Sequence, residues 1–377
     1  MYGYRNGFVH AIGALAGVVI GLVGVFLLLP IVGGWVPGSN WRIVVVLGVA
    51  IALLAGGYAI GTAIAGAIER SVKAKGLRVV NRLLGAVTNV VASALVVLVL
   101  SSSLGGFGIP TLSKVIGEST VLRTIAGLTP DPAEAFLAQL RSSLLSTGIP
   151  AIQEALGGIT ETPVLPDDVD TGSEALTRAA QSVVRITGTA ASCSQTQSGS
   201  GFVVAAERIV TNAHVVSGVV EPIVESPGGQ VLTGSVVYFD PVDDLAIIAV
   251  PGLDAAPLAL GDTAPVGETG VIDGYPFGGP FVTSAAEVLA VSTSNVNDIY
   301  GSNASPREVY SLATTVNEGD SGGPFLANDG TVIGVVFAKS ANTANLGYAM
   351  TMAELDPVAS MAPGLTRPVG TGQCVRG

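Results

Sequence analysis

Residues 317–324 constrain this chain more than any other stretch, because they set one serine, Ser321, among three glycines and a proline. The segment reads Asn-Glu-Gly-Asp-Ser-Gly-Gly-Pro. Glycine tolerates positive φ and the close approach of another molecule, so this composition favours a sharp turn that exposes the serine. The main-chain N–H groups of Gly319 and Ser321 would then be free to bind an oxyanion, as attack by a serine on a carbonyl requires. Asp320 is expected to be structural. An ordinary glycine-rich hairpin has the same composition, so the interpretation depends on partners for the serine.

A serine nucleophile needs a base, usually an imidazole that a carboxylate orients. The chain has two histidines. His10 lies at the edge of an apolar run and is expected to be incidental. His214 lies within Ile-Val-Thr-Asn-Ala-His-Val-Val at 209–216, ahead of the adjacent aspartates Asp243 and Asp244 and the apolar run 245–248. This order of histidine, aspartate and serine resembles that of trypsin-like proteases, which favours a catalytic set over the alternative, a core or surface histidine.

The N-terminal part of the chain is too apolar for a simple soluble domain. Hydrophobic residues make up 49% of the chain and charged residues 12%, whereas a soluble domain has about 25% charged residues. Three stretches, 8–32, 43–68 and 83–100, have about the 20 apolar residues that cross a bilayer. A cleaved signal peptide would be shorter and followed by soluble sequence. Buried core helices are the other alternative, but no charged residue interrupts 43–68.

Two further features bear on the predicted spans. Glycines recur at 13, 17, 21 and 24, a spacing that allows close helix packing and is equally compatible with lipid-facing filler. The loop after the second stretch carries five basic residues: Arg70, Lys73, Lys75, Arg78 and Arg82. The positive-inside rule places this loop in the cytoplasm. Everything after residue 100 is therefore expected outside the cytoplasm.

The composition and residue pattern of the chain change twice more. Residues 104–173 read as a linker with short amphipathic helices, one beginning at Asp131, and an acidic, proline-containing end at 162–168. This linker is expected to cover the membrane surface or to contact the domain that follows, and it is a candidate site of self-cleavage. From about residue 174, short β-branched runs alternate with Gly, Pro and Asp, which predicts an all-β domain over 174–377.

The motifs together resemble a known family. Residues 174–377 look like a chymotrypsin-fold serine protease of the HtrA-like branch, from the Gly-Asp-Ser-Gly-Gly-Pro, Thr-Asn-x-His and Asp-Leu-Ala-Ile segments, with Gly-Ser-Gly-Phe-Val-Val at 199–204 and Gly-Tyr-Pro-Phe-Gly at 274–278. The whole layout is similar to the MarP-type membrane-anchored periplasmic serine proteases of actinobacteria, whose membrane part (here 1–103) resembles colicin V production (CvpA) proteins. The resemblance implies a helical transmembrane region followed by a double six-stranded β-barrel.

The resemblance also implies roles for residues. His214, Asp244 and Ser321 would form the catalytic triad, with Gly319 and Ser321 as the oxyanion hole. Asp244 is selected because it directly precedes the apolar strand, which leaves Asp243 as a solvated neighbour that one sequence does not exclude. The substrate pocket would have Thr315 at its base, so a trypsin-like demand for Lys or Arg is not expected. Its wall would be an edge strand able to pair with the substrate backbone, made by Val336, Phe337, Ala338 and Lys339.

The two cysteines, Cys193 and Cys374, would form one disulfide by the same resemblance, with two unpaired thiols as the alternative. No metal site and no cofactor are expected. Two departures from the family are noted: the family usually carries four spans where three are counted here, and no PDZ domain is expected after the serine.

The predicted function is a membrane-anchored serine endopeptidase that acts outside the cytoplasm on peptides or proteins of the cell envelope, in envelope stress or acid resistance. The alternatives are a catalytically latent protease-fold scaffold, a CvpA-like membrane or transport protein with an accessory protease domain, and a serine esterase. The net charge of −11 argues against nucleic-acid binding. Membrane lipid is an expected partner, and no oligomeric state is predicted.

Overall fold

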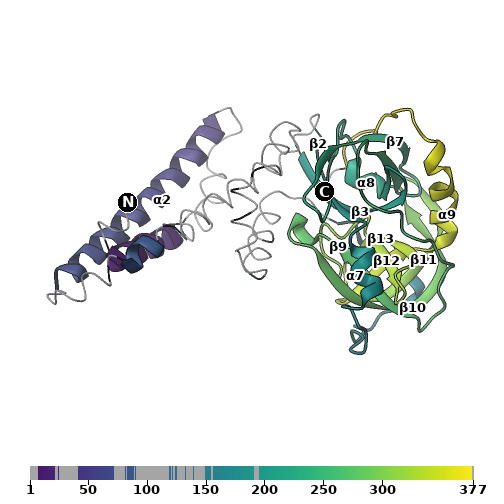
Figure 1. Ribbon diagram of the computed structural model, residues 1–377, viewed down its shortest axis with the longest axis horizontal. Coiled ribbons are helices and arrows are strands. Elements are labelled where there is room, and N and C mark those ends of the chain that lie inside the picture. The colour runs from purple at the N-terminus through teal and green to yellow at the C-terminus, as the bar shows by residue number, and fades with distance from the viewer. Residues whose placement is uncertain are drawn as a thin grey trace. The chain divides into compact units, whose positions relative to one another are not determined.

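A computed structural model describes residues 7–21, 24, 41–71, 81, 83–88, 90, 149–153, 156–190 and 195–375, with single residues at 119, 121, 124, 132 and 139. The chain divides into two compact units, 1–98 and 99–377. The first is helical in its described parts and the second is built mainly from β-strands (Figure 1). Each unit is described separately.

The helical unit contains a helix over residues 7–21 and the longer α2, Trp41–Ser71. Glycines allow the two helices to pack close together. A Cβ atom added at Gly17 would collide with the carbonyl oxygen of Gly57, and one added at Gly13 would collide with Ala65 and Gly61. The regularly spaced glycines of the first helix therefore form the surface against which α2 packs, as small residues do in membrane proteins.

The predicted spans are only partly within the described residues. Among these, Ile51–Ile68 of α2 is long and apolar enough to cross a membrane, and Gly7–Gly21 is a shorter apolar helix. The predicted second span, 43–68, lies within α2. The ends of the first span, most of the third span and most of the predicted linker helices lie outside the described residues.

The described residues of the second unit form two sheets (Figure 1), each of seven strands. One has the order β6-β5-β2-β3-β4-β8-β7 and the other β1-β13-β12-β9-β10-β11-β14, with an additional pairing of β13 with β14. The strands of the first sheet are β2 (Val183–Ala190), β3 (Gln195–Ala205), β4 (Arg208–Thr211), β5 (Ile223–Glu225), β6 (Val231–Thr233), β7 (Ser235–Asp240) and β8 (Leu245–Ala249). Those of the second are β1 (Ala151–Ile152), β9 (Thr269–Gly274), β10 (Val282–Asn297), β11 (Ala304–Ala313), β12 (Pro324–Ala327), β13 (Val332–Ser340) and β14 (Leu346–Met350).

The expected pair of six-stranded barrels thus takes a different form. The β13–β14 pairing closes six strands of the second sheet, β9 to β14, into a ring. The described strands of the first sheet remain open in their pairing order, and β1 is an addition from the linker that the sequence did not predict.

Alternating apolar residues explain why these segments form sheets around a core. In β2, Val184 and Ile186 are fully buried beside Val203 and Ile209 of the neighbouring strands. In the second sheet, Tyr310 and Phe325 meet edge to face, with their ring centroids 5.7 Å apart. Full burial of one such side chain contributes about 1.5–3 kcal/mol, so these side chains stabilise both sheets.

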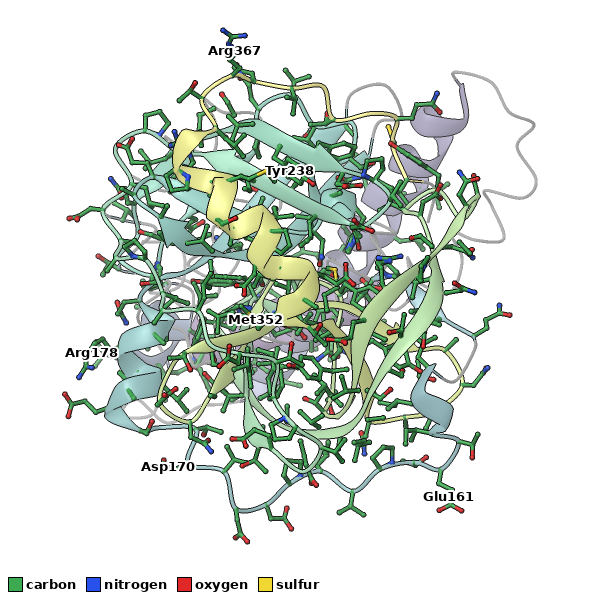
Figure 2. The ribbon with its side chains drawn as sticks, turned by 90° about the vertical axis from the view of Figure 1, so that its right-hand side faces the viewer. Glu161, Asp170, Arg178, Tyr238, Met352 and Arg367 are labelled. Atoms are coloured by element: carbon green, nitrogen blue, oxygen red, sulfur yellow. The ribbon has the colours of Figure 1, made fainter. Side chains whose placement is uncertain are left out.

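Short helices complete the second unit. They are η1 (Leu156–Gly158), α7 (Glu174–Ala180), α8 (Ala213–Val216), η2 (Pro276–Gly278), α9 (Met352–Met361) and η3 (Ala362–Gly364). Ser173 caps α7 by accepting from the main-chain N–H of Leu176, as an N-cap serine commonly does. Figure 2 looks onto α9, which lies across the side of the unit that carries Tyr238 and Met352.

The linker contacts the β unit, one of the two expected positions for it. β1 pairs in parallel with the end of β13, where Lys339 donates its main-chain N–H to the carbonyl of Pro150 at 3.1 Å. The hydroxyl of Ser311 donates to the carbonyl of Leu156 at 2.8 Å. The linker residues 149–159 therefore add a short strand and a turn to the second sheet.

Candidate active site

The turn that carries Ser321 is fixed by main-chain hydrogen bonds to both sheets. Gly322 donates to the carbonyl of Val336 on β13 at 2.8 Å, and Ser200 of β3 donates to the carbonyl of Ser321, also at 2.8 Å. Gly322 has φ 82°, and a Cβ there would meet the oxygens of Ser200 and Thr211. This position requires glycine for both conformation and space, so the turn directly bridges the two sheets.

A second set of contacts fixes the peptide that precedes the turn. The carbonyl of Glu318 accepts from the N–H of Phe277 in η2, and the carbonyl of Gly319 accepts from Ser200 Oγ at 2.7 Å. Gly319 has φ 95°. Because C=O and N–H point in opposite directions in a trans peptide, the Gly319 N–H is directed away from η2. In the described part of the chain the amides of Gly319 and Ser321 donate to no acceptor, which leaves two donors for an oxyanion.

His214 and Asp244 form a close pair. His214 lies in α8 directly after β4, and Asp244 lies just before β8, the strand that pairs with β4. Nδ1 of His214 donates to Oδ2 of Asp244 at 2.8 Å and lies 3.0 Å from Oδ1, while the main-chain N–H of His214 donates to Oδ1 at 2.9 Å. With Nδ1 as the donor, Nε2 is the lone-pair nitrogen that can accept a proton.

Two local features hold this pair. Asp244 has φ 56°, an uncommon conformation for a residue other than glycine. Asn212 donates from its side chain to the carbonyl of Asp244 at 2.9 Å. This bond ties the left-handed residue to the histidine segment. Both side chains are largely buried, His214 9% and Asp244 3% exposed, so water does not compete strongly for their hydrogen bonds.

The serine turn lies against the histidine segment. A Cβ at Gly199 would collide with the side chain of Val215 and approach the carbonyl oxygen of Ser321. A Cβ at Gly322 would meet the hydroxyl of Thr211 and the main-chain nitrogen of Asn212. The three residues predicted from sequence are thus brought into one region. Ser321 Oγ is buried and has no hydrogen-bond partner among the described residues. The serine-to-histidine hydrogen bond is therefore absent from this resting arrangement, and apo sites commonly show such loose geometry.

Two buried carboxyls flank the serine turn. Burial raises the pKa of Asp320 to about 7, against hydrogen bonds from Asn317 and the charge of Lys339, which lower it. Burial raises the pKa of Asp273 on β9 to about 6, with the hydroxyl of Thr283 acting in the opposite direction. Asp320 accepts the N–H of Asn317 at 2.8 Å, which confirms the structural contacts expected of it. Asp273 was not predicted, because nothing in its sequence context distinguishes a buried strand aspartate.

The predicted pocket residues differ in their environment. Val336, Phe337 and Ala338 are buried on β13, whereas Thr315 is exposed and bonds weakly to Asn345 at 3.5 Å. The prediction that Thr315 lies at the base of a pocket does not fit its exposure. Pairing of β12 with β13 ends at Val335, and β1 begins to pair at Lys339. The β1 strand thus occupies the edge at Lys339, which was expected to be open to substrate.

Comparison with known proteins agrees with this geometry. Residues 199–335 match the family of trypsin-like peptidase domains, and residues 1–130 match the Colicin V production protein family. Serine protease Rv3671c of Mycobacterium tuberculosis (strain ATCC 25618 / H37Rv) is 34% identical over 269 residues, which are 71% of this chain and 67% of that protein. The crystal structure of the Rv3671c protease from M. tuberculosis, active form, is 36% identical with a TM-score of 0.54, and the match covers 60% of this chain and 100% of that one.

The chain belongs to the Rv3671c family of serine proteases. A DegP-like probable periplasmic serine endoprotease of Halomonas elongata is 31% identical over 158 residues, 40% of this chain and 32% of that protein. The resemblance inferred from the motifs, a CvpA-type region followed by a chymotrypsin-like serine protease, is confirmed. The colicin V match and the apolar stretch Ile51–Ile68 within the described residues indicate that the protease is associated with a membrane.

A cavity of about 480 Å³ is lined in part by residues that flank η2, among them Tyr275 and Gly279. Arg185 on β2 lines it, forms an ion pair with Glu225, and donates from Nη1 to the carbonyl of Gly278 at 2.9 Å. Gly278 belongs to the same turn as Phe277, which binds the carbonyl of Glu318. Sequence reasoning missed this chain of contacts, although the Gly-Tyr-Pro-Phe-Gly segment at 274–278 was a signal that the turn is special.

The C-terminal tail of the protease is fastened beside α8. Ser217 donates to the carbonyl of Gln373 at 2.6 Å and accepts the N–H of Val375 at 3.0 Å. Cys374 lies against Gly218. Cys193 lies outside the described residues, so the Cys193–Cys374 disulfide stays a prediction.

Proposed function

We propose that the protease is a membrane-anchored endopeptidase in which His214, Asp244 and Ser321 hydrolyse peptide bonds through an acyl-enzyme. The observation that carries the proposal is the hydrogen bond from His214 Nδ1 to Asp244 at 2.8 Å, with the serine turn packed against the same segment. This bond fixes the tautomer whose Nε2 can take a proton from Ser321.

The proposed reaction follows from these positions. As Ser321 Oγ attacks the substrate carbonyl carbon, its proton moves to His214 Nε2, and Asp244 stabilises the imidazolium. The amides of Gly319 and Ser321 stabilise the oxyanion. The C–N bond breaks as His214 protonates the leaving amine, and water then hydrolyses the acyl-enzyme by the same route in reverse. No cofactor or metal takes part in this scheme.

The proposed substrates are peptides or proteins of the cell envelope, bound as an added strand. The main chain at Phe337 and Ala338 is paired with neither β12 nor β1, which supports strand addition at this short edge. Val336, Phe337 and Ala338 would line the primary pocket, with Thr315 at its rim rather than its base.

The proposed location is multi-pass in the membrane, with the protease unit on the periplasmic side and a role in envelope stress or acid resistance. The basic loop at 70–82 supports this orientation. The tail contacts of Ser217 support a Cys193–Cys374 disulfide, which would close a long loop and stabilise the unit by about 4–5 kcal/mol in the chain-entropy model.

A latent state is the second candidate function. The buried Ser321 Oγ without a hydrogen-bond partner favours a resting protease that substrate binding must order. In that case the same residues act, but only after the serine side chain meets His214.

The test is labelling of the full-length chain in detergent with a fluorophosphonate, which phosphonylates activated serines. Wild type should be labelled, Ser321→Ala should not, and Ser360→Ala, which removes an exposed hydroxyl, should label as wild type does. Labelling lost on reduction would tie the disulfide to the active conformation. No labelling of folded, oxidised wild type, even with added casein peptides, would overturn the proposal.

A further inference from the structure

The linker strand β1 lies at the edge of β13 along which the substrate is proposed to bind. Lys339 donates its main-chain N–H to the carbonyl of Pro150 at 3.1 Å. Ala341 donates in the same way to the carbonyl of Ile152 at 2.9 Å. A main-chain N–H that donates to the linker is not available to a substrate strand at the same time. β1 therefore occupies part of the edge that the substrate would use.

The open part of this edge is short and begins beside the serine turn. Gly322 donates to the carbonyl of Val336 at 2.8 Å, which places the start of the open edge next to the nucleophile. Phe337 and Ala338 follow, and on this edge neither pairs with β12 or β1. At Lys339 the pairing with β1 begins. Since strands pair residue by residue, two substrate residues before the scissile bond fit beside β13, and a third meets β1.

Two buried side chains anchor the linker, one before β1 and one after it. Ile149 belongs to the same buried apolar cluster as Val336. Leu156 belongs to the cluster that contains Phe337 and Ala338. Both clusters thus include residues that are proposed to line the primary pocket. The linker is therefore packed into the substrate-binding side of the second sheet.

Polar contacts hold the segment that follows β1. The side chain of Asn342 donates from Nδ2 to the carbonyl of Gln153 at 3.0 Å. Gly157 has φ 69°, and a Cβ there would collide with the hydroxyl of Ser311. Glycine therefore lets the linker turn closely against β11. β1 itself has only two residues, so a substrate strand competes with few main-chain hydrogen bonds.

We propose that β1 is a specificity-determining segment of the protease, which limits the substrate to two paired residues before the scissile bond. This inference rests on the proposed function. A longer substrate pairs at Lys339 only when β1 leaves the edge, so its binding is weakened by the linker contacts that must break. Once β1 is released, the third substrate residue gains the N–H of Lys339.

Two proline substitutions at adjacent positions separate release of β1 from its retention. The carbonyl of Ile152 accepts from Ala341, and in an extended strand the N–H of the same residue faces the same edge. Ile152→Pro removes this N–H and disrupts the pairing. The carbonyl of Pro150 faces β13, so in a trans peptide the N–H of Ala151 faces away. Ala151 is exposed, and Ala151→Pro is therefore the matched control that keeps the pairing.

The experiment uses the full-length chain in detergent and two peptidyl diphenyl phosphonates, which phosphonylate an activated serine. Both probes carry the same two apolar residues next to the phosphorus, and the longer probe extends them by two alanines. The measured quantity is the second-order rate constant of the longer probe divided by that of the shorter probe. A fluorophosphonate without a peptide reports the reactivity of Ser321 itself. Thermal unfolding of each variant shows that it is folded.

We expect wild type and Ala151→Pro to react equally fast with both probes. Ile152→Pro should raise the ratio of the rate constants about fivefold, which corresponds to one additional main-chain hydrogen bond at Lys339. An unchanged ratio in Ile152→Pro, including one in which both rate constants fall together, would overturn the proposal and leave β1 as packing only. An equal rise in Ala151→Pro would overturn it as well.

Asn342→Ala decides the matter if Ile152→Pro does not fold. It removes an exposed side chain that donates to the carbonyl of Gln153, so the ratio should rise roughly twofold. An unchanged ratio would overturn the proposal, as would a protein that reacts with the fluorophosphonate but with neither peptide probe in any variant. No fluorophosphonate labelling of wild type would instead refute the proposed function, and this inference with it.

Discussion

Glycines shape both units of this protein, but they do so in different ways. In the helical unit, Gly13 and Gly17 have ordinary helical surroundings and serve by lacking a side chain, so that α2 can approach. In the protease unit, Gly319 and Gly322 have φ of 95° and 82° and serve by adopting a backbone that other residues resist. The helix interface requires only the small size of glycine, whereas the serine turn requires both its small size and its left-handed backbone conformation. The same residue type is therefore expected to tolerate substitution differently in the two regions.

The largest expected effect is at the serine turn. Gly322→Ala adds a Cβ that meets the oxygens of Ser200 and Thr211 and forces a left-handed alanine. Displacing the nucleophile by about 1 Å lowers a rate on the order of 100-fold, so fluorophosphonate labelling should fall by at least this factor. Gly252→Ala is the control, with φ 81° but open space around it. It should cost about 1 kcal/mol of stability and leave labelling intact. Equal losses in both variants would mean that conformation alone matters.

The second prediction concerns the carboxyl of Asp320, which is buried in the serine turn. Asp320 has its pKa raised from 3.8 to about 7, so the folded state holds a proton that the unfolded state releases. This contribution to stability is fully present below about pH 4 and is lost as the pH rises through 7, on the order of 4 kcal/mol at most.

Thermal unfolding of the full-length chain can be followed by the β-sheet signal in circular dichroism. Protonation of Asp320 should raise the midpoint of this unfolding as the pH is lowered. Asp320→Asn should remove that part of the slope. Asp329→Asn is the control, because hydrogen bonds from Thr331 lower the pKa of this exposed carboxyl and its contribution has the opposite sign. An unchanged slope in Asp320→Asn would show that the carboxyl is ionised in the folded state.

In the helical unit, neighbouring glycines offer a matched pair. Gly57 faces Gly17 and Gly21 across the helix interface, whereas Gly56 has nothing within 4 Å of its Cβ position. Gly57→Leu should reduce oxidative cross-linking between Gly24→Cys and Leu53→Cys at least fivefold, and Gly56→Leu should change it less than twofold. Labelling of Ser321 should stay within twofold in both variants. Similar cross-linking in the two variants would count against a specific glycine interface.

The smallest effect tests how the left-handed turn at η2 supports the serine turn. Arg185→Met removes the donor to the Gly278 carbonyl, and loss of one such charged hydrogen bond at a partly exposed site costs about 1 kcal/mol. We expect the labelling rate constant to fall by at most about fivefold on this basis, measured beside Arg178→Met as the exposed control. A rate constant equal to that of wild type would mean that the sheets alone hold η2 in place.

Local patterns were enough to predict a large part of the molecule. The Gly-Asp-Ser-Gly-Gly-Pro segment predicted the serine, because turn chemistry and acyl-transfer chemistry demand particular residues at adjacent positions. The order of His214, Asp244 and Ser321 matched the order of the family that the motifs resemble. Apolar run length located α2, and short β-branched runs located most strands of the protease unit. Their boundaries shifted, as for β10, which extends over Val282–Asn297, because strand length depends on the partner strand.

Tertiary structure alone decided what depends on residues distant in sequence. No local pattern indicates that β1 from the linker pairs with Lys339, that Thr315 is exposed, or that Arg185 supports η2. Burial raised the pKa values of Asp273 and Asp320, and burial is a property of the packed chain. Arg307 shows the difference most clearly. In the sequence it is one arginine among several, and only the packing of β11 brings it under Phe337 and against the carbonyl of Asn297, where it is 1% exposed.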